Sequence, residues 1–488
     1  MSGPYVLSID QGTTSTRAIV FDRAGNARGR SSRELTQYYP QPGWVEHDPE
    51  EIWRGVCLTV PEALADAGLS ASDLGAIGLT NQRETTVLWD RSTGAASGRA
   101  IVWQDRRTSE YCRQRASDET WLRERTGLVL DPYFSATKLR WILERHESRG
   151  QAFGTIDSFI LWRLTGGLLH ATDRTNASRT LLVNLHTGDW DDELLRYFGV
   201  PREVLPTIRP SAGDFGNTCG LDFLPDGVPI RGVAGDQQAA LFGQCAFAPG
   251  EAKCTYGTGA FFLQHLGDKP LLSRNRLLTT IAASGADRIC YALEGAVFVA
   301  GAAVQWLRDG LRLFADAAEI EELARGTSPS DAIFVPGFVG LGAPHWVPEA
   351  RGVLFGLTRG TAPADISRAT LEGVALQVVD LIDAAASDAG QRLRTLRVDG
   401  GMARNAWFLQ RQADFLGLSV VQSPTSEATA LGAAYLAGLA SGVWKAEEEL
   451  RALQGVARTF SPAIGDKERD EMLCRWRRAV ETVIAFYR

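Results

Sequence analysis

Two turns of similar composition, one in each half of the chain, place the strongest constraint on its fold. The first turn, residues 11–16, reads Gln-Gly-Thr-Thr-Ser-Thr and separates two strand-like segments, 5–10 and 17–22. The second turn, Gly257-Thr258-Gly259, also lies between two strand-like segments. A turn rich in Gly and Thr presents backbone amides and hydroxyls that can cradle phosphate groups. Either turn alone is more often a plain hairpin, but together they favour a duplicated phosphate-binding core.

The length of the chain agrees with a duplication. Its 488 residues exceed the roughly 250–300 residues at which a single core stops growing. Strands followed by helices in both halves predict two α/β domains, 1–245 and 246–488, that face one another. The boundary is expected near residues 245–250, where Ala-Phe-Ala-Pro-Gly ends a helical run.

Composition and charge exclude several classes of partner. A net charge of −7 argues against nucleic acid, which favours a basic face. No apolar run approaches the roughly 20 residues that span a bilayer, and no signal peptide is evident. Seven scattered cysteines without a Cys-x-x-Cys pair predict neither a disulfide framework nor a zinc site. We therefore expect a cytoplasmic protein, and we also expect a homo-oligomer, a dimer or a tetramer.

Hydrophobic patterns predict further elements. Residues 76–80 and 85–90 are expected to form a strand pair, with Asn-Gln-Arg-Glu at the bend. Long periodic segments predict helices, and a short apolar run predicts a strand before a Gly-Gly turn. These segments are helix 361–386, strand 396–398, helix 405–416 and an Ala/Gly-rich, closely packing helix at 427–439.

Two aspartates are candidate chemical groups. Asp236 follows small residues, Ala234 and Gly235, and precedes an apolar helical run, so it could accept a proton from a substrate hydroxyl. Asp10 lies at the end of the first predicted strand, beside the first turn, where it could help to hold a metal ion. An acid for a proton and an acid for a metal together indicate phosphoryl transfer.

Adjacent Arg83 and Glu84 could bind a polyol. Sugar alcohols carry hydroxyls that both donate and accept, so neighbouring guanidinium and carboxylate groups can hold adjacent hydroxyls. Trp103, Tyr133 and Phe261 could cover the C–H face of such a substrate. The alternative is that the charged pair is a solvated ion pair and that each aromatic side chain belongs to the core.

The nucleotide site is expected to differ from the common phosphate loops. The chain contains no Gly-Lys dipeptide, no Gly-x-Gly-x-x-Gly and no Gly-x-Ser-x-Gly. Asp399-Gly-Gly401 is instead a strand-to-helix turn at which the backbone can approach a ligand. Its position in the second half favours an adenosine site, although many α/β loops look similar.

These segments resemble the FGGY family of carbohydrate kinases over residues 5 to about 445. The strings Asn81-Gln-Arg-Glu-Thr-Thr86 and Gly235-Asp-Gln-Gln-Ala-Ala240 together are typical of the glycerol branch of that family. The other matching strings begin at Asp10, Gly43, Trp103, Asp131, Tyr256, Glu294, Gly340, Phe355, Asp399 and Ala430.

The resemblance implies two ribonuclease-H-like domains, as in actin and hexokinase, and ATP- and Mg²⁺-dependent phosphorylation of glycerol to sn-glycerol 3-phosphate. By motif, the glycerol side would comprise Arg83, Glu84, Trp103, Tyr133, Asp236, Gln237 and Phe261. The phosphates would contact Thr13, Thr14, Ser15 and Arg17, with Mg²⁺ on Asp10 and Asp236. The nucleotide side would comprise Gly257, Thr258, Gly301, Gln305, Gly401 and Asn405.

The chain departs from the family pattern at two places. Val347 stands where the glycerol branch commonly carries Asp. Residues 217–230 lack both the Gly-rich basic loop that binds fructose 1,6-bisphosphate in some members and any histidine. We therefore expect neither control by that ligand nor control by histidine phosphorylation. Two alternatives to glycerol phosphorylation stay open: a kinase for another small polyol or ketose, and a non-catalytic actin-like ATPase, which would not need the Arg83-Glu84 pair.

Overall fold

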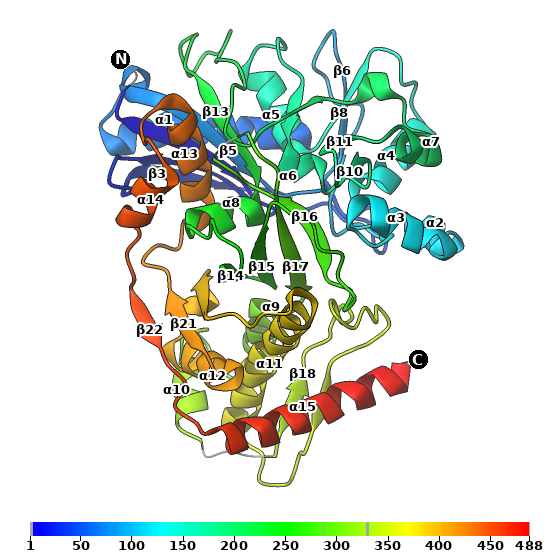
Figure 1. The fold of residues 1–488 in the computed structure, drawn as a ribbon, viewed down its shortest axis with the longest axis vertical. Coiled ribbons are helices and arrows are strands. Elements are labelled where there is room, and N and C mark those ends of the chain that lie inside the picture. Colours follow the sequence, from blue (N-terminus) through cyan, green and yellow to red (C-terminus); the bar gives the residue numbers. More distant parts are fainter. Residues whose placement is uncertain (1–2, 286, 328–330, 488) are drawn as a thin grey trace.

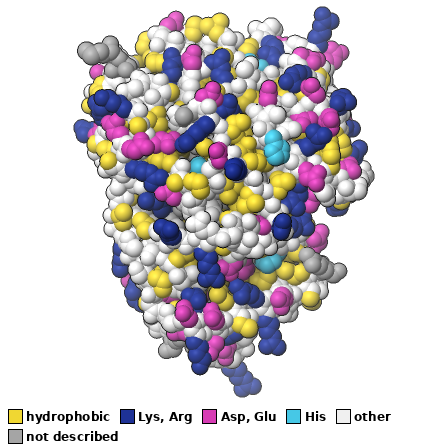
Figure 2. All heavy atoms as spheres, in the orientation of Figure 1, with side chains coloured by type: hydrophobic (Ala, Val, Ile, Leu, Met, Phe, Trp, Pro, Cys, Tyr) yellow, Lys and Arg dark blue, Asp and Glu magenta, His cyan; other side chains and the backbone are white. Residues whose placement is uncertain are grey.

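The structure, a computed structural model, describes residues 3–285, 287–327 and 331–487. Its two lobes are stacked along the longest axis, and each is built around a central sheet with helices beside it (Figure 1). Most of the N-terminal half of the chain forms the upper lobe in this view. Acidic and basic side chains are interspersed over the visible face (Figure 2). The two sheets with their flanking helices confirm the predicted α/β architecture.

The first sheet contains the predicted hairpin. Its strand order is β13 (Ile230–Gly235), β5 (Leu74–Asn81), β1 (Tyr5–Gln11), β2 (Ser15–Phe21) and β3 (Ala27–Glu34). Strands β1, β5 and β13 are parallel, whereas β1, β2 and β3 form an antiparallel meander. Because carboxyl ends of parallel strands meet at one edge, the residues after β1, β5 and β13 gather there.

The second sheet repeats this pattern. Its strand order is β16 (Leu278–Ala282), β17 (Cys290–Val297), β15 (Ala260–Gly267), β14 (Ala252–Tyr256), β20 (Thr395–Asp399), β21 (Ser419–Gln422) and β22 (Arg458–Phe460). Strands β14, β20 and β21 are parallel, while β14, β15 and β17 are antiparallel. Five strands of each sheet therefore share one topology, as the two turns of similar composition predict.

The predicted strand pair 76–80 and 85–90 is wrong. Strand β5 is parallel to β1 on one side and to β13 on the other, so neither of its edges is free for another strand. The second segment instead forms β6 (Val87–Asp90), which pairs with β8 (Gln151–Gly154) in a separate two-stranded sheet. The Asn-Gln-Arg-Glu bend therefore carries the chain out of the first sheet.

Helix α13 (Ala428–Ser441) belongs to the first sheet in space, although it lies late in the chain. It packs on β1, β5 and β13 and on α8 (Asp236–Gly243) (Figure 1). Glycines allow this close approach: a Cβ on Gly78 would lie 2.3 Å from Ala433 O, and one on Gly432 would lie 1.8 Å from Ala239 O. The close packing predicted for this helix is confirmed. The division of the chain at 245/246 stays a prediction. Helix α13 comes from the second part of the chain but packs on the sheet of the first.

The remaining elements surround the two sheets. The other helices are α1 (Pro49–Ala67), α2 (Ser109–Gln114), α3 (Glu119–Thr126), α4 (Ser135–Leu143), α5 (Ile156–Leu164), α6 (Arg174–Ala177), α7 (Asp192–Phe198), α9 (Gly301–Gln305), α10 (Glu319–Arg325), α11 (Pro363–Ala389), α12 (Ala406–Leu416), α14 (Glu447–Leu453) and α15 (Asp466–Tyr487). The other strands are β4 (Glu46–His47), β7 (Ala100–Ile101), β9 (Ala171–Asp173), β10 (Val183–Asn184), β11 (Asp189–Trp190), β12 (Thr207–Arg209), β18 (Ile333–Val335) and β19 (Val353–Phe355). Within the described ranges, none of these helices combines the length and apolar character of a membrane-spanning helix.

Candidate active site

The first turn joins β1 to β2 at the carboxyl edge of the first sheet. It is closed by a hydrogen bond of 2.8 Å from the Gly12 amide to Ser15 O. The Thr14 side chain is exposed and that of Thr13 is half-buried. The Trp103 indole N–H donates to Thr13 Oγ1 at 3.0 Å, so this turn touches one of the predicted substrate aromatics.

Asp10 is the second-to-last residue of β1 and forms a salt bridge with Arg17 on β2. Arg17 also pairs with Glu427, just before α13, at 2.8 Å. Burial raises the pKa of the Asp10 carboxyl; Arg17 opposes this shift and Glu427 adds to it. The structure therefore places two predicted residues, Asp10 and Arg17, in direct contact, beside an acid that the sequence does not suggest.

Asp236 is the first residue of α8, directly after β13. Its Oδ1 lies 3.0 Å from Arg83 Nε, and its side chain is 29% exposed, so it stays reachable from outside. A Cβ on Gly235 would lie 2.7 Å from Arg83 Cγ and Cδ, so a glycine is needed for this approach. Burial among protein atoms raises the pKa of the Asp236 carboxyl, while Arg83 and Lys253 oppose that shift.

A buried charge network surrounds the predicted clamp. Arg83 donates to both oxygens of Glu294, through Nη1 and, at 3.0 Å, through Nη2. Arg179 Nη2 also donates to Glu294 Oε1 at 3.0 Å, and Arg179 Nε donates to Glu84 Oε1 at 2.6 Å. All four side chains are at most 3% exposed. Arg83 and Glu84 are therefore not the solvated surface pair that was the alternative interpretation.

Glu294 and Arg179 are site residues that were not predicted from the sequence. Glu294 stands among apolar residues in β17, whose eight residues are all buried. Burial raises the pKa of its carboxyl, but Arg179 and Arg83 more than offset this, and the pKa falls to about 2. A lone charge within an apolar strand was the available signal, since such a charge is rarely buried without a partner.

Glu84 has an unusual backbone conformation. Its φ angle is 61°, in the left-handed region that residues other than glycine rarely adopt. Its carbonyl accepts hydrogen bonds of 3.1 Å from the hydroxyls of Ser135 and Thr86, which hold this conformation. Strain of this kind clusters at functional sites. The strained backbone at Glu84 therefore marks the bend after β5 as part of the candidate site.

The three predicted aromatics lie together. The Trp103 and Tyr133 rings are edge-to-face with centroids 5.5 Å apart, and the Trp103 and Phe261 centroids are 6.5 Å apart. Phe261 lies on β15, so the second sheet contributes to the same cluster as the first lobe. The Lys253 ammonium on β14 likewise donates to the Gln237 side chain on α8.

The second turn and the start of α9 form one unit. The Gly301 amide donates to Gly257 O at 2.9 Å, and Thr258 O accepts from Ala300 and Ala302 at 2.8 and 3.1 Å. A Cβ on Gly301 would lie 2.6 Å from Gly257 O, which explains the glycine there. Gln305, at the end of α9, is exposed.

The predicted adenosine turn follows β20. A Cβ on Gly401 would meet no atom within 4 Å, so the backbone there is open to a ligand. The Asn405 side-chain oxygen accepts the Phe408 amide at 2.8 Å and thereby caps α12. Asn405 therefore has a clear structural role, and its contact with a nucleotide stays a prediction.

The metal prediction rests on Asp10 and Asp236. Both lie at the carboxyl edge of the first sheet, at the ends of two parallel strands that flank β5. Among the residues that the structure describes, no three His, Cys, Asp or Glu side chains form a metal site on their own. Mg²⁺ is usually held by one or two carboxylates plus waters and substrate phosphates, so this donor set fits it.

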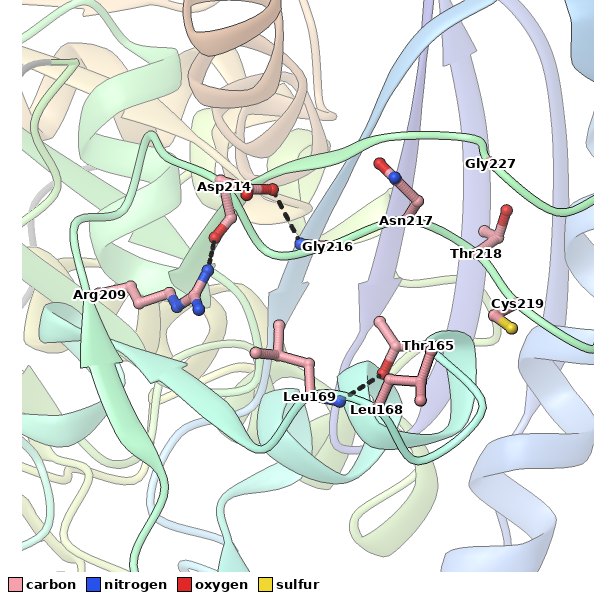
Figure 3. A pocket seen from close by; sticks show the side chains of 10 residues that line it. All are labelled: Thr165, Leu168, Leu169, Arg209, Asp214, Gly216, Asn217, Thr218, Cys219 and Gly227. Carbon is pink, nitrogen blue, oxygen red and sulfur yellow. Dashed lines mark hydrogen bonds between the residues drawn. The ribbon is translucent and has the colours of Figure 1, made fainter.

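A separate pocket of 370 Å³ lies away from these residues (Figure 3). It lies between the segment after α5 and residues 209–227, and Arg209 points toward Asp214 at one end (Figure 3). None of the predicted site residues lines it. It includes part of segment 217–230, where neither fructose 1,6-bisphosphate control nor phosphohistidine control is expected.

Known proteins match this chain over nearly its full length. Models of the N-terminal and C-terminal domains of the FGGY family of carbohydrate kinases match residues 5–243 and 252–441. The chain is 53% identical to a Bordetella parapertussis protein named "Glycerol kinase", covering 98% of this chain and 96% of that protein. A protein of the same name from Alcanivorax borkumensis is 54% identical, with 98% of each chain covered.

A solved structure shows the same architecture. The crystal structure of Plasmodium falciparum glycerol kinase with ADP superposes with a TM-score of 0.91, at 35% sequence identity and 98% coverage of both chains. The predicted resemblance is confirmed by these matches. The chain belongs to the FGGY family of carbohydrate kinases.

Proposed function

We propose that the chain phosphorylates glycerol with ATP to give sn-glycerol 3-phosphate. The observation that carries this proposal is the placement of Asp236, within reach of solvent, 3.0 Å from Arg83, whose neighbour in the chain, Glu84, is buried. Proteins named glycerol kinase share more than half of this sequence over nearly its full length. The ADP that accompanies the similar Plasmodium enzyme supports ATP as the phosphoryl donor.

The glycerol side has both polar and apolar parts. Arg83 and Asp236 offer a donor and an acceptor for adjacent hydroxyls, and Glu84 offers a second acceptor. Trp103, Tyr133 and Phe261 form an aromatic wall whose faces suit the C–H side of a short polyol. The Gln237 amide, held by Lys253, completes the polar set.

Asp236 acts as the general base in this proposal. Proton transfer is most effective when the pKa of the base approaches the working pH. Burial moves the pKa of Asp236 upward in that direction, and Arg83 keeps the carboxylate form from being lost. The deprotonated glycerol C3 oxygen then forms a bond to the γ-phosphorus as the bond to the ADP oxygen breaks.

The two turns bind the nucleotide from two sides. Amides and hydroxyls of Thr13, Thr14 and Ser15, with Arg17, face the phosphates from the first lobe. The opposite side comprises Gly257, Thr258, Gly301, Gln305, Gly401 and Asn405. Asp10 and Asp236 would hold Mg²⁺, which when bound neutralises charge on the phosphate oxygens.

Two further proposals concern the setting of the enzyme. We place it in the cytoplasm, because all seven cysteines are free thiols, as expected in a reducing compartment. We also keep the prediction of a homo-oligomer, a dimer or a tetramer.

A substrate panel tests the reaction. ADP release would be followed with ATP and glycerol, dihydroxyacetone, erythritol or xylulose. Glycerol should give the highest kcat/KM, and ATP consumption without polyol should be far slower. Higher kcat/KM with a longer polyol or ketose would favour a kinase for that substrate. Equal ATP consumption with and without polyol would favour the actin-like ATPase.

A further inference from the structure

A buried histidine lies behind the first turn. His47, in β4, is 0% exposed. Its Nε2 lies 2.8 Å from Gln37 Oε1, and its Nδ1 lies 3.2 Å from Gln82 Nε2. Both ring nitrogens therefore bind a glutamine side chain. Neither glutamine belongs to the substrate or nucleotide residues described above.

Each glutamine connects His47 to a carbonyl of the first turn. Gln37 Nε2 donates to Thr13 O at 2.7 Å. Gln82 Nε2 lies within 3.2 Å of Gly12 O and 3.0 Å of Gln11 Oε1. His47 is thus linked to two successive residues of the turn by two arms, one through Gln37 to Thr13 and one through Gln82 to Gly12.

The partners of each glutamine assign the orientation of its amide, and the two Gln82 Nε2 protons are shared among three acceptors, His47 Nδ1, Gln11 Oε1 and Gly12 O. Gln82 Oε1 accepts from the Thr85 hydroxyl at 2.8 Å, so the Gln82 nitrogen faces His47. Gln37 uses its nitrogen for Thr13 O, so its oxygen faces His47. This assigns His47 the neutral tautomer that carries its proton on Nε2, which donates to Gln37 Oε1, and leaves Nδ1 as an acceptor facing the Gln82 amide. Burial supports this neutral form because it lowers the pKa of His47 to about 4.

The network ends at β5, where a backbone hydrogen bond that does not involve His47 holds the chain before Arg83. Gln82 directly precedes Arg83, and its backbone amide donates to Gln11 O at 2.7 Å, which ties the end of β5 to the end of β1. We propose that His47 is a positioning residue that fixes the first turn against the end of β5 through Gln37 and Gln82. The proposal rests on the proposed function, since the first turn matters there as the phosphate-binding element.

Three substitutions separate the two arms. H47L removes both hydrogen bonds, H47Q can place an amide near the Nε2 position to donate to Gln37, and H47N can place an oxygen near the Nδ1 position to accept from Gln82. The Kd of a non-hydrolysable ATP analogue would be measured by calorimetry, with the Kd of glycerol beside it. We expect at least a tenfold weaker analogue Kd in H47L, partial recovery in H47Q and H47N, and a glycerol Kd within threefold of wild type.

A matched control tests whether any buried histidine would behave in this way. His265, in β15, is 4% exposed, and its Nδ1 accepts the Gly267 amide. H265L should lower thermal stability yet keep the analogue Kd within twofold. If H47L does not fold, Q37L removes the arm to Thr13 from a half-buried side chain and should weaken the analogue at least threefold.

The outcomes separate this inference from the proposed function. Wild-type protein that phosphorylates glycerol, with analogue binding unchanged in folded H47L, overturns the positioning role alone. The same holds if H265L loses as much affinity as H47L, or if glycerol and analogue affinities fall together. If H47L binds the analogue more weakly but the wild-type protein does not phosphorylate glycerol, the role of His47 is supported and the proposed reaction is overturned.

Discussion

Arg83 and Glu294 form a bidentate salt bridge that links the two sheets. Arg83 follows β5 of the first sheet, and Glu294 lies in β17 of the second. Both side chains are almost fully buried. The same guanidinium reaches Asp236 at 3.0 Å. The orientation of the residue proposed to bind glycerol therefore depends on an acid from the other half of the chain.

The first prediction is that E294Q loses both stability and glycerol binding. A neutral amide cannot balance Arg83 and Arg179, and breaking a buried ion pair typically costs about 3–5 kcal/mol. The glycerol KM should rise at least tenfold, and denaturant unfolding should show the loss of stability. D309N, which removes an exposed partner of Arg308, should change neither quantity. A wild-type glycerol KM in E294Q would show that Glu294 does not position Arg83.

The second prediction concerns the clamp. R83A leaves a buried acceptor without its charged donor, and hydrogen bonds to charged groups contribute about 1.5–3 kcal/mol each. We expect the glycerol KM to rise at least tenfold while the KM for ATP changes less than threefold. R202A, at an exposed pair with Asp192, serves as the control in the same assay. Unchanged glycerol kinetics in R83A would remove Arg83 from the substrate site.

The third prediction tests the base. D236N keeps the size of the side chain but cannot accept a proton at neutral pH, and general-base catalysis contributes about 10²–10⁴-fold. The kcat should fall by at least the lower of these factors, while the glycerol Kd from calorimetry should change much less. D214N alters an exposed acid away from the site and should keep full activity. A D236N variant with more than about a tenth of the wild-type kcat would exclude the role of base.

The fourth prediction concerns the dependence of stability on pH. Burial lowers the pKa of His265 to about 4 from an ordinary value of 6.5. Between these values the unfolded chain binds a proton that the folded chain does not, so stability falls as the pH drops from 6.5 toward 4. H265Q should flatten the fall in unfolding free energy by up to about 1.4 kcal/mol per pH unit within this window. H186Q, at an exposed histidine, should keep the wild-type slope.

Local patterns predicted the hairpins and the helices well, because short-range signals determine them. The turn between β1 and β2, the start of α8 at Asp236 and the close-packing helix α13 all follow from nearby residues. The pairing of 76–80 with 85–90 failed because it depends on which strand edges are already in use. No local signal reports that competition.

The partners of the site residues were harder to predict for the same reason. Arg179 and Glu294 lie 115 positions apart, yet they share a hydrogen bond. His47 could be recognised within a matching string, but its two glutamine partners come from different segments of the chain. Long-range contacts of this kind follow from the fold, which a single sequence specifies only indirectly.

The return of α13 to the first sheet has a consequence for biosynthesis. The face of β1, β5 and β13 that α13 covers is apolar and closely packed, and α13 begins about 185 residues after α8 ends. At about 5–20 residues per second, the ribosome needs roughly 10–40 s to make that intervening chain. During this time the nascent first lobe exposes an unfinished apolar surface. We therefore expect a fragment released after residue 245 to aggregate or to bind chaperones, and co-expression of residues 246–488 to restore its solubility.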